Sequence, residues 1–128
     1  MGKKYLIDTN TLIDAQMKKL PEKGLQFLTK IINEDFTVSF ITYIEFLGYK
    51  DVTQATKEFI ALADIIGINK TIIDTCIVLR KAHKIKLPDA IIAATALTNG
   101  LILITRNRSD FINIHGLHVI DPYNLKAR

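Results

Sequence analysis

The chain has 128 residues, of which 48% are hydrophobic and 23% are charged, a size that suits one domain with a real core and a composition that excludes a disordered chain. Its single cysteine, Cys76, excludes an internal disulfide framework and a cysteine-built zinc site. The net charge of +4 is modest evidence for a polyanionic partner. Its apolar runs fall far below the roughly 20 residues that span a bilayer, and MGKKYLID reaches an acid too early for a signal peptide. We therefore expect a cytoplasmic protein without a membrane partner.

Strands and helices are expected to alternate along the whole chain. The apolar stretches that predict strands are 5–7, 37–41, 64–68, 101–104 and 118–120. The patterns that predict helices are 11–19, a segment opened by Pro21, a segment that starts at Thr42, 51–63, 71–85, and a segment that starts near Pro88. This alternation predicts one α/β domain over residues 1–128, with a mainly parallel five-stranded sheet flanked by helices on both faces.

The stretch from Lys86 to Phe111 is the most informative part of the chain. Pro88 and Asp89 stand at a helix start, and the following residues are almost all apolar or small, which predicts a buried helix. Gly100 supplies a helix stop, and residues 101–104 form an unbroken aliphatic run typical of a strand covered on both faces. The sequence then changes from apolar to polar in TRNRSD, residues 105–110. Because ligands of parallel α/β sheets bind beyond the carboxyl ends of the strands, we expect the site at this loop.

Acidic side chains gather at the predicted strand ends. Asp8 directly follows the first strand, Glu45 lies one turn beyond the second, and Asp110 follows 101–104 together with Asn107. Two carboxylates about 4 Å apart repel by roughly 4 kcal/mol at an effective dielectric near 20, so such a cluster needs protons or cations. Oxygen ligands select Mg²⁺ or Mn²⁺. Together with Asp89, these residues fit a metal-assisted hydrolase of phosphodiesters.

Each acid also has an interpretation that is purely structural. Asp8 or Asn10 can cap the following helix through its side chain. Thr42 and Glu45 fit a capping box, in which the Glu folds back onto the backbone N–H of the cap residue. Glu45 cannot fill the capping role and a metal-binding role at once.

Basic residues flank the predicted site on two segments. Those near the end of the 71–85 helix are Arg80, Lys81, His83, Lys84 and Lys86. A solvated helix C-terminus explains this cluster, because cations there interact favourably with the helix dipole. The alternative is that Lys84 and Lys86, with Arg106 and Arg108, bind the phosphates of RNA.

Four motifs in order along the chain carry a resemblance to a known family. LIDTN at the first strand, the Glu of TYIE, PDAIIAATAL and LITRNRSDF together resemble the PIN domain, specifically the small VapC-type toxin of prokaryotic toxin-antitoxin pairs. The resemblance covers essentially the whole chain. It implies a five-stranded parallel sheet, Mg²⁺- or Mn²⁺-dependent endoribonuclease activity, a homodimer, and inhibition by a cognate antitoxin protein.

The resemblance also assigns residues to roles. It places the first three acids at Asp8, Glu45 and Asp89, and it leaves the fourth position open between Asn107 and Asp110. With Asn107 in that position, a second metal site would be weak or would form only with RNA. The residues that match positions orienting the acids or the water are Thr9, Asn10 and Thr105.

Two other functions remain as alternatives. A phosphoacceptor receiver domain has similar length and the same alternation, but it needs an acid after the third strand, where this chain has Asn69 and Lys70. A PIN fold that binds RNA or protein without cutting is disfavoured because Asp8, Glu45 and Asp89 are all present.

Overall fold

A computed structural model describes residues 5–48 and 52–125. Five parallel strands form one sheet in the order β3-β2-β1-β4-β5. The strands are β1 (Tyr5–Ile7), β2 (Thr37–Ser39), β3 (Asp64–Ile66), β4 (Ile102–Ile104) and β5 (Val119–Ile120). A receiver domain of the flavodoxin-like type has the order 2-1-3-4-5. The observed order therefore rules out the receiver alternative and confirms the predicted parallel sheet.

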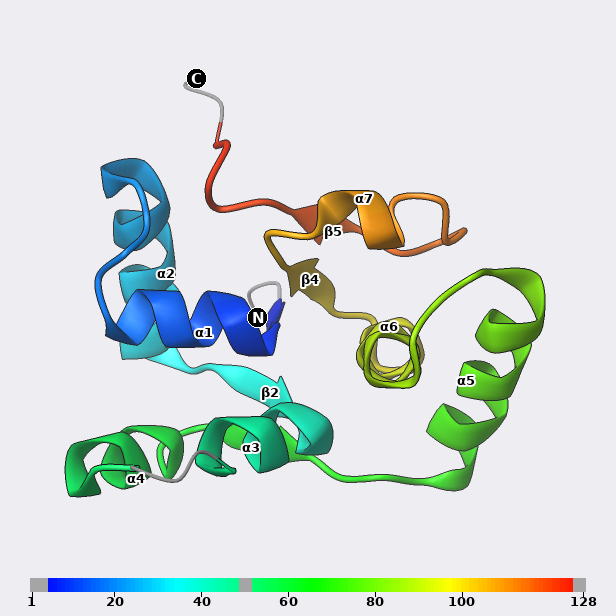
Figure 1. The fold of residues 1–128 in the computed structure, drawn as a ribbon, viewed down its shortest axis with the longest axis horizontal. Helices are drawn as coiled ribbons and strands as arrows, with labels where there is room; N and C mark the ends of the chain where they lie inside the picture. The colour runs from blue at the N-terminus through cyan, green and yellow to red at the C-terminus, as the bar shows by residue number, and fades with distance from the viewer. Residues whose placement is uncertain (1–4, 49–51, 126–128) are drawn as a thin grey trace.

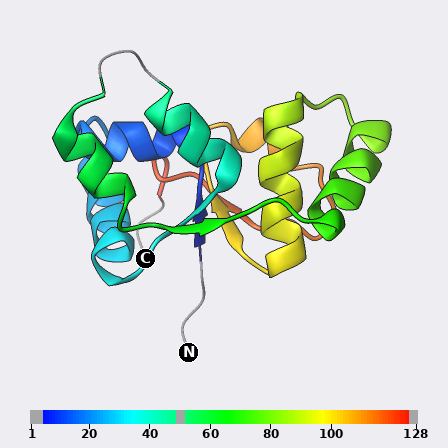
Figure 2. The ribbon, with the colours of Figure 1, turned by 90° about the horizontal axis from the view of Figure 1, so that it is seen from below.

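Helices cover both faces of this sheet (Figures 1 and 2). The helices of the described residues are α1 (Thr9–Gln16), α2 (Glu22–Glu34), α3 (Phe40–Leu47), α4 (Gln54–Ile60), α5 (Lys70–Ala82), α6 (Leu87–Asn99) and α7 (Arg108–Phe111). In Figure 2, α1 to α4 lie on one side of the sheet, and α5 and α6 lie on the other. None of these helices is long and apolar enough to cross a membrane.

The core consists of two clusters, one on each face of the sheet. Successive side chains of a strand point to opposite faces. Leu6 and Leu103 accordingly pack with the residues of α5 and α6. Ile7 and Ile104 pack with those of α1 and α2. The two central strands are thus buried on both sides, as the aliphatic run at 101–104 predicts.

The predicted buried helix is α6. Its central residues from Ile92 to Ala96 are buried, and the helix packs mainly against α5. Pro88 lies in its first turn, where a missing N–H costs nothing. Gly100 ends it in the left-handed conformation, with a φ of 63°. Both termini of α6 are therefore set by the residues that predicted them.

The expected boundary between the second strand and the next helix is wrong. β2 ends at Ser39, and α3 begins at Phe40 rather than at Thr42. Ser39 is the cap, because its Oγ accepts a hydrogen bond from the backbone N–H of Ile41 at 3.2 Å. Thr42 lies inside the helix, so the capping box with Glu45 does not exist.

Other boundaries differ by a few residues. The predicted 51–63 helix is α4, which is shorter, and Asp51 lies outside the described residues. Leu62, inside the predicted range, follows the observed helix and is 74% exposed. The 71–85 helix ends at Ala82, which places Lys84 and Lys86 in the connection to α6. The short helix α7 was not predicted.

Candidate active site

Asp8 lies at the carboxyl end of the central strand β1. The residue is buried, with only 6% of its surface exposed. Oδ1 accepts a hydrogen bond from the backbone N–H of Thr9 at 2.8 Å, and Oδ2 accepts one from the hydroxyl of Thr105 at 2.7 Å. Asp8 is thus the N-cap of α1, as the structural interpretation expected. Each carboxylate oxygen has a second lone pair, so this cap does not prevent Asp8 from binding another group.

Thr105 fixes the loop beyond β4 beside Asp8. Its hydroxyl donates to Asp8 and accepts a hydrogen bond from the backbone N–H of Asn107 at 3.1 Å. The backbone N–H of Asp8 also donates to the carbonyl of Ile104 at 3.0 Å. The two bonds of Asp8 join the ends of the adjacent parallel strands β1 and β4, which explains why residues distant in sequence meet here.

Glu45 reaches the site from α3. One of its carboxylate oxygens accepts a hydrogen bond from the hydroxyl of Thr9 at 2.6 Å. The same hydroxyl lies 3.0 Å from that of Thr42. Glu45 is therefore held by α1 rather than by its own helix start, and the side chain remains largely exposed. Sequence reasoning assigned Thr42 to the cap and missed this role.

Asp89 completes a cluster of three acids. It lies in the first turn of α6 and is half-buried. A hollow of about 130 Å³, here called the acidic hollow, is lined by Asp8, Thr9, Asn10, Glu45, Pro88, Asp89, Ile92 and Asn107. The described residues that line it include three carboxylates and no basic side chain. Four separate elements contribute these residues.

A second hollow of about 360 Å³, here called the lysine hollow, opens beside the first. It shares Asn10, Glu45, Pro88, Asp89 and Asn107 with the acidic hollow and adds Lys84, Ile85, Lys86 and Asp110. Asn107 lines both hollows, whereas Asp110 lines only the second. Both candidates for the fourth position, Asn107 and Asp110, therefore lie beside the three acids, and the structure leaves that position open between them.

Burial and mutual repulsion raise the pKa of two of these carboxyl groups. For Asp8, desolvation raises the pKa most, the bonds from Thr105 and Thr9 oppose this, and the charges of Glu45 and Asp110 add to it. For Asp89, desolvation again comes first, followed by the negative charges of Asp8 and Asp110. Lys86 partly lowers the pKa of Asp89. The acids are thus close enough to disfavour one another's ionised form.

The donor set fits a hard divalent cation. Carboxylate and amide oxygens are the ligands that Mg²⁺ and Mn²⁺ prefer, and a cation would relieve the repulsion that raises the pKa of Asp8 and Asp89. Within the described residues, however, no group of three or more His, Cys, Asp or Glu side chains is drawn together as tightly as a bound ion would hold them.

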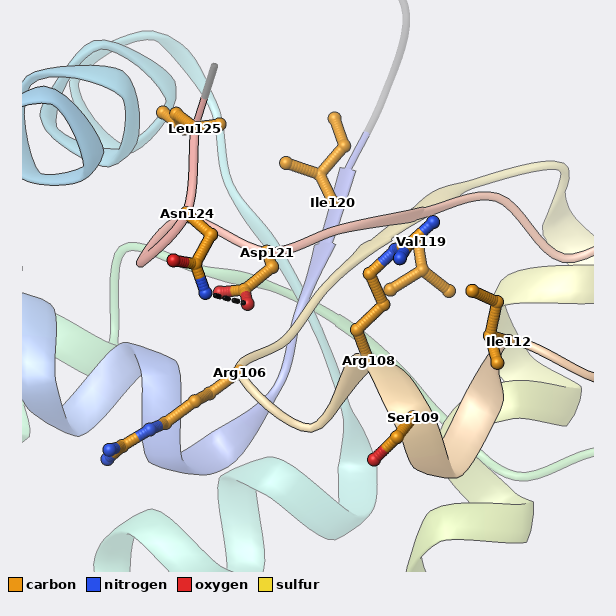
Figure 3. A pocket seen from close by; sticks show the side chains of 9 residues that line it. All are labelled: Arg106, Arg108, Ser109, Ile112, Val119, Ile120, Asp121, Asn124 and Leu125. Carbon is orange, nitrogen blue, oxygen red and sulfur yellow. Dashed lines mark hydrogen bonds between the residues drawn. The ribbon is translucent and has the colours of Figure 1, made fainter.

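The predicted basic residues divide between two places. Lys84 and Lys86 line the lysine hollow. Arg106 and Arg108 line a third hollow together with residues of β5 and of the segment that follows it (Figure 3). Arg80 lies exposed on α5 and lines neither of them.

Tyr123 forms a contact to this segment that sequence reasoning missed. Its ring lies 5.0 Å from the guanidinium of Arg106, and its hydroxyl donates to Asp14 of α1. The signal in the sequence was weak, because a lone Tyr in a C-terminal tail has many explanations.

The fold and the acid cluster define a parallel α/β protein with an acidic site at the carboxyl ends of its strands. The family model of the PIN domain matches residues 5–117. The chain belongs to the PIN domain family, which confirms the resemblance found in the sequence. PIN domains are nucleases, so membership supports a hydrolase.

Solved structures with the same fold include a toxin-antitoxin complex. A chain of a toxin-antitoxin complex from Klebsiella pneumoniae is 36% identical, with a TM-score of 0.77; the match covers 94% of this chain and 99% of that one. VapBC-1 from nontypeable Haemophilus influenzae is 26% identical, covers 94% and 98%, and has a TM-score of 0.75. FitAcB from Neisseria gonorrhoeae, at 24% identity, a TM-score of 0.75 and coverage of 94% and 99%, shares the fold. None of the curated proteins compared with the chain matches it.

Proposed function

We propose that the protein is a Mg²⁺- or Mn²⁺-dependent endoribonuclease and the toxin of a toxin-antitoxin pair. The observation that carries this proposal is the acidic hollow, where Asp8, Glu45 and Asp89 meet without a basic side chain among the described lining residues. A structural ion pair would need an opposite charge there. An acid cluster at the carboxyl ends of parallel strands, with no basic side chain among the described residues that line its hollow, is typical of a functional site.

Each residue has a definite role in this proposal. Asp8, Glu45 and Asp89 would hold the cation, with Asp110 or Asn107 as a further ligand. When bound, the cation would activate a water and stabilise the leaving oxygen of the phosphodiester. Thr105 and the backbone of Thr9 orient the Asp8 carboxylate through their hydrogen bonds.

Other residues position the acids and the RNA. The Thr9 hydroxyl fixes Glu45, and Asn10 lines the acidic hollow, where it can orient the water. Lys84 and Lys86 lie on the rim of the adjoining hollow, where their charges would bind the phosphates of RNA.

We also propose that the protein forms a homodimer and is inhibited by a cognate antitoxin. The 36% identical chain belongs to a toxin-antitoxin complex. In addition, Ile73, Ile77 and Val78 are exposed on α5, at 43%, 48% and 62% of their surface. Such an apolar face is typical of a protein interface. Light scattering of the purified chain, alone and with a candidate antitoxin, measures both associations.

Incubation of the purified protein with RNA tests the activity. Wild type should cleave internally when Mg²⁺ or Mn²⁺ is present and should be inactive in EDTA. Asp8→Asn, which keeps a side chain able to accept the bond from Thr9, should be folded and inactive. RNA binding without cleavage under all these conditions would instead identify a non-catalytic PIN module.

A further inference from the structure

The third hollow lies next to the acid cluster, separated from it by a single backbone segment. This hollow, here called the arginine hollow, has a volume of about 940 Å³ and is lined on one side by Arg106 and Arg108. Asn107 and Asp110 of the same segment line the other two hollows. Consecutive Cα atoms are about 3.8 Å apart. The side chains of this one short segment therefore reach all three hollows, so neighbouring nucleotides of one strand could contact both the acidic and the arginine hollow.

The chemistry of the arginine hollow differs from that of the acidic hollow. Two arginines and one carboxylate, Asp121, line it, so its charge favours a polyanion. Figure 3 shows Arg106 and Arg108 leaving their segment in opposite directions. Val119 and Ile120 of the edge strand β5 also line it and are partly exposed. Cationic groups beside an apolar surface suit a phosphate and the base attached to it.

Asp121 is oriented before any ligand arrives. Its Oδ1 accepts a hydrogen bond from the backbone N–H of Tyr123 at 2.9 Å, and its Oδ2 accepts one from Asn124 Nδ2 at 3.0 Å. Figure 3 shows the second of these bonds. Each oxygen keeps one further lone pair. The fixed carboxylate thus offers two adjacent acceptors, which match two adjacent N–H donors on a ligand.

We propose that the arginine hollow binds a guanine of single-stranded RNA beside the phosphodiester that is cut, with Asp121 accepting from the base. Among the four RNA bases, guanine is the one whose Watson–Crick edge carries two neighbouring donor groups, N1–H and the N2 amino group. Arg106 and Arg108 bind the adjoining phosphates. This inference rests on the proposed ribonuclease function and adds a base preference to it.

Binding measured without hydrolysis tests the inference separately from catalysis. Fluorescence anisotropy in EDTA compares labelled RNA octamers that carry guanosine, inosine or adenosine at one central position. Inosine lacks only the N2 amino group. Wild type should bind the guanosine octamer roughly tenfold more tightly than the inosine octamer, for one lost hydrogen bond to a charged group. The adenosine octamer should bind more weakly still, because adenine lacks both donors.

Asp121→Asn should abolish this preference, because an amide presents one acceptor and one donor. Asp35→Asn makes the same chemical change at an exposed position at the end of α2 and should keep the preference. Arg108→Gln should weaken the binding of all three octamers alike. Arg80→Gln removes the same charge from α5, outside the hollow, and should weaken their binding less.

Three possible results distinguish a guanine-binding hollow from the alternatives. Equal binding of the three octamers, or a preference that survives in Asp121→Asn, overturns the inference even if wild type cleaves RNA with Mg²⁺. A preference that depends on Asp121 in a protein that never cleaves RNA refutes the ribonuclease and leaves a guanine-binding hollow. If Asp121→Asn changes only the affinity for the antitoxin, the hollow is a protein interface and the inference is wrong.

Discussion

Glu45 is the residue whose substitution should change activity while leaving the stability of the fold nearly unchanged. Its carboxylate accepts from Thr9 and takes no part in capping α3, which Ser39 caps. Glu45→Gln preserves an acceptor for Thr9 but removes the charge. We expect the free energy of unfolding to change by less than about 0.5 kcal/mol, as for exposed substitutions. Nuclease activity should fall by at least roughly tenfold. Urea unfolding and a cleavage assay measure the two effects, and an activity near wild type would remove Glu45 from the site.

Thr105 is expected to matter for stability and activity together. Thr105→Val keeps the shape of a fully buried side chain and deletes its hydroxyl. Asp8 loses a donor and the backbone N–H of Asn107 loses an acceptor. Leaving such groups unpaired costs about 1 to 3 kcal/mol, so unfolding should become easier by that amount and cleavage should slow.

Thr95→Val is the matched control for this change. Thr95 is equally buried, but its hydroxyl donates only to the carbonyl of Ile91 within α6. That variant should keep full activity. If both variants lose activity equally, the effect comes from general loosening of the fold and not from Asp8.

Gly100 ends helix α6 by adopting a left-handed backbone conformation. Its φ of 63° is a conformation that costs other residues about 1 to 2 kcal/mol. A Cβ placed there would meet no atom within 4 Å, so the cost of Gly100→Ala is conformational alone. We expect a loss of roughly 1 kcal/mol in the free energy of unfolding.

Gly67→Ala provides the comparison for this prediction. Gly67 also has open space around its Cβ position, and its φ lies outside the left-handed region. The substitution should be neutral or should stabilise slightly, by less than about 1 kcal/mol, because it restricts the unfolded chain. Chemical denaturation of both variants gives the sign directly. Equal losses would show that φ does not set the cost at Gly100.

The element boundaries that sequence predicted well are those marked by strong local chemistry. Pro88 and Gly100 delimit α6 because each imposes a backbone constraint that tertiary packing does not override. The start of α3 was predicted two residues late, since Phe40 and Ile41 continue the apolar run of β2 and look like strand residues. The four-residue helix α7 leaves no periodic pattern, because one turn is too short to repeat.

The candidate site was predictable only in part, from residues that follow the strands. Polar segments that follow buried strands gather at one edge of a parallel sheet, which is why Asp8, directly after β1, and Asp110, in the polar segment after β4, could be predicted to meet. Hydrogen bonds that cross between elements were not predictable. The bond from Thr9 to Glu45 depends on the packing of α1 against α3, and no spacing in the sequence reports it.

The acid cluster lowers the stability of the whole folded molecule. In the folded state the pKa of Asp8 and Asp89 is raised above the ordinary value of 3.8. A raised pKa means that the folded state binds protons more tightly than the unfolded state does. Stability therefore falls as pH rises from about 3.8 through the folded-state pKa, and the penalty is complete above it.

Neutralising Asp89 is expected to relieve this penalty. In EDTA at pH 7, Asp89→Asn should melt above wild type, and the difference should shrink as the pH is lowered through the raised pKa values of the native carboxyls. Asp35→Asn, an exposed acid far from the cluster in the fold, should melt close to wild type across the same pH range. A lower melting temperature for Asp89→Asn would mean that its interaction with the start of α6 outweighs the repulsion.

Divalent cations should reverse the order of these melting temperatures. A ligand that binds only the folded state stabilises it by RT ln(1 + [L]/Kd), about 2.7 kcal/mol at a concentration one hundred times Kd. Millimolar Mg²⁺ or Mn²⁺ should therefore raise the melting temperature of wild type and of Asp35→Asn, but raise that of Asp89→Asn much less, because one carboxylate ligand is gone. Differential scanning calorimetry of the three proteins, with EDTA and with each metal, makes the comparison. Equal shifts in all three would place the cation elsewhere on the surface, and the acid cluster would then lack the partner that its repulsion requires.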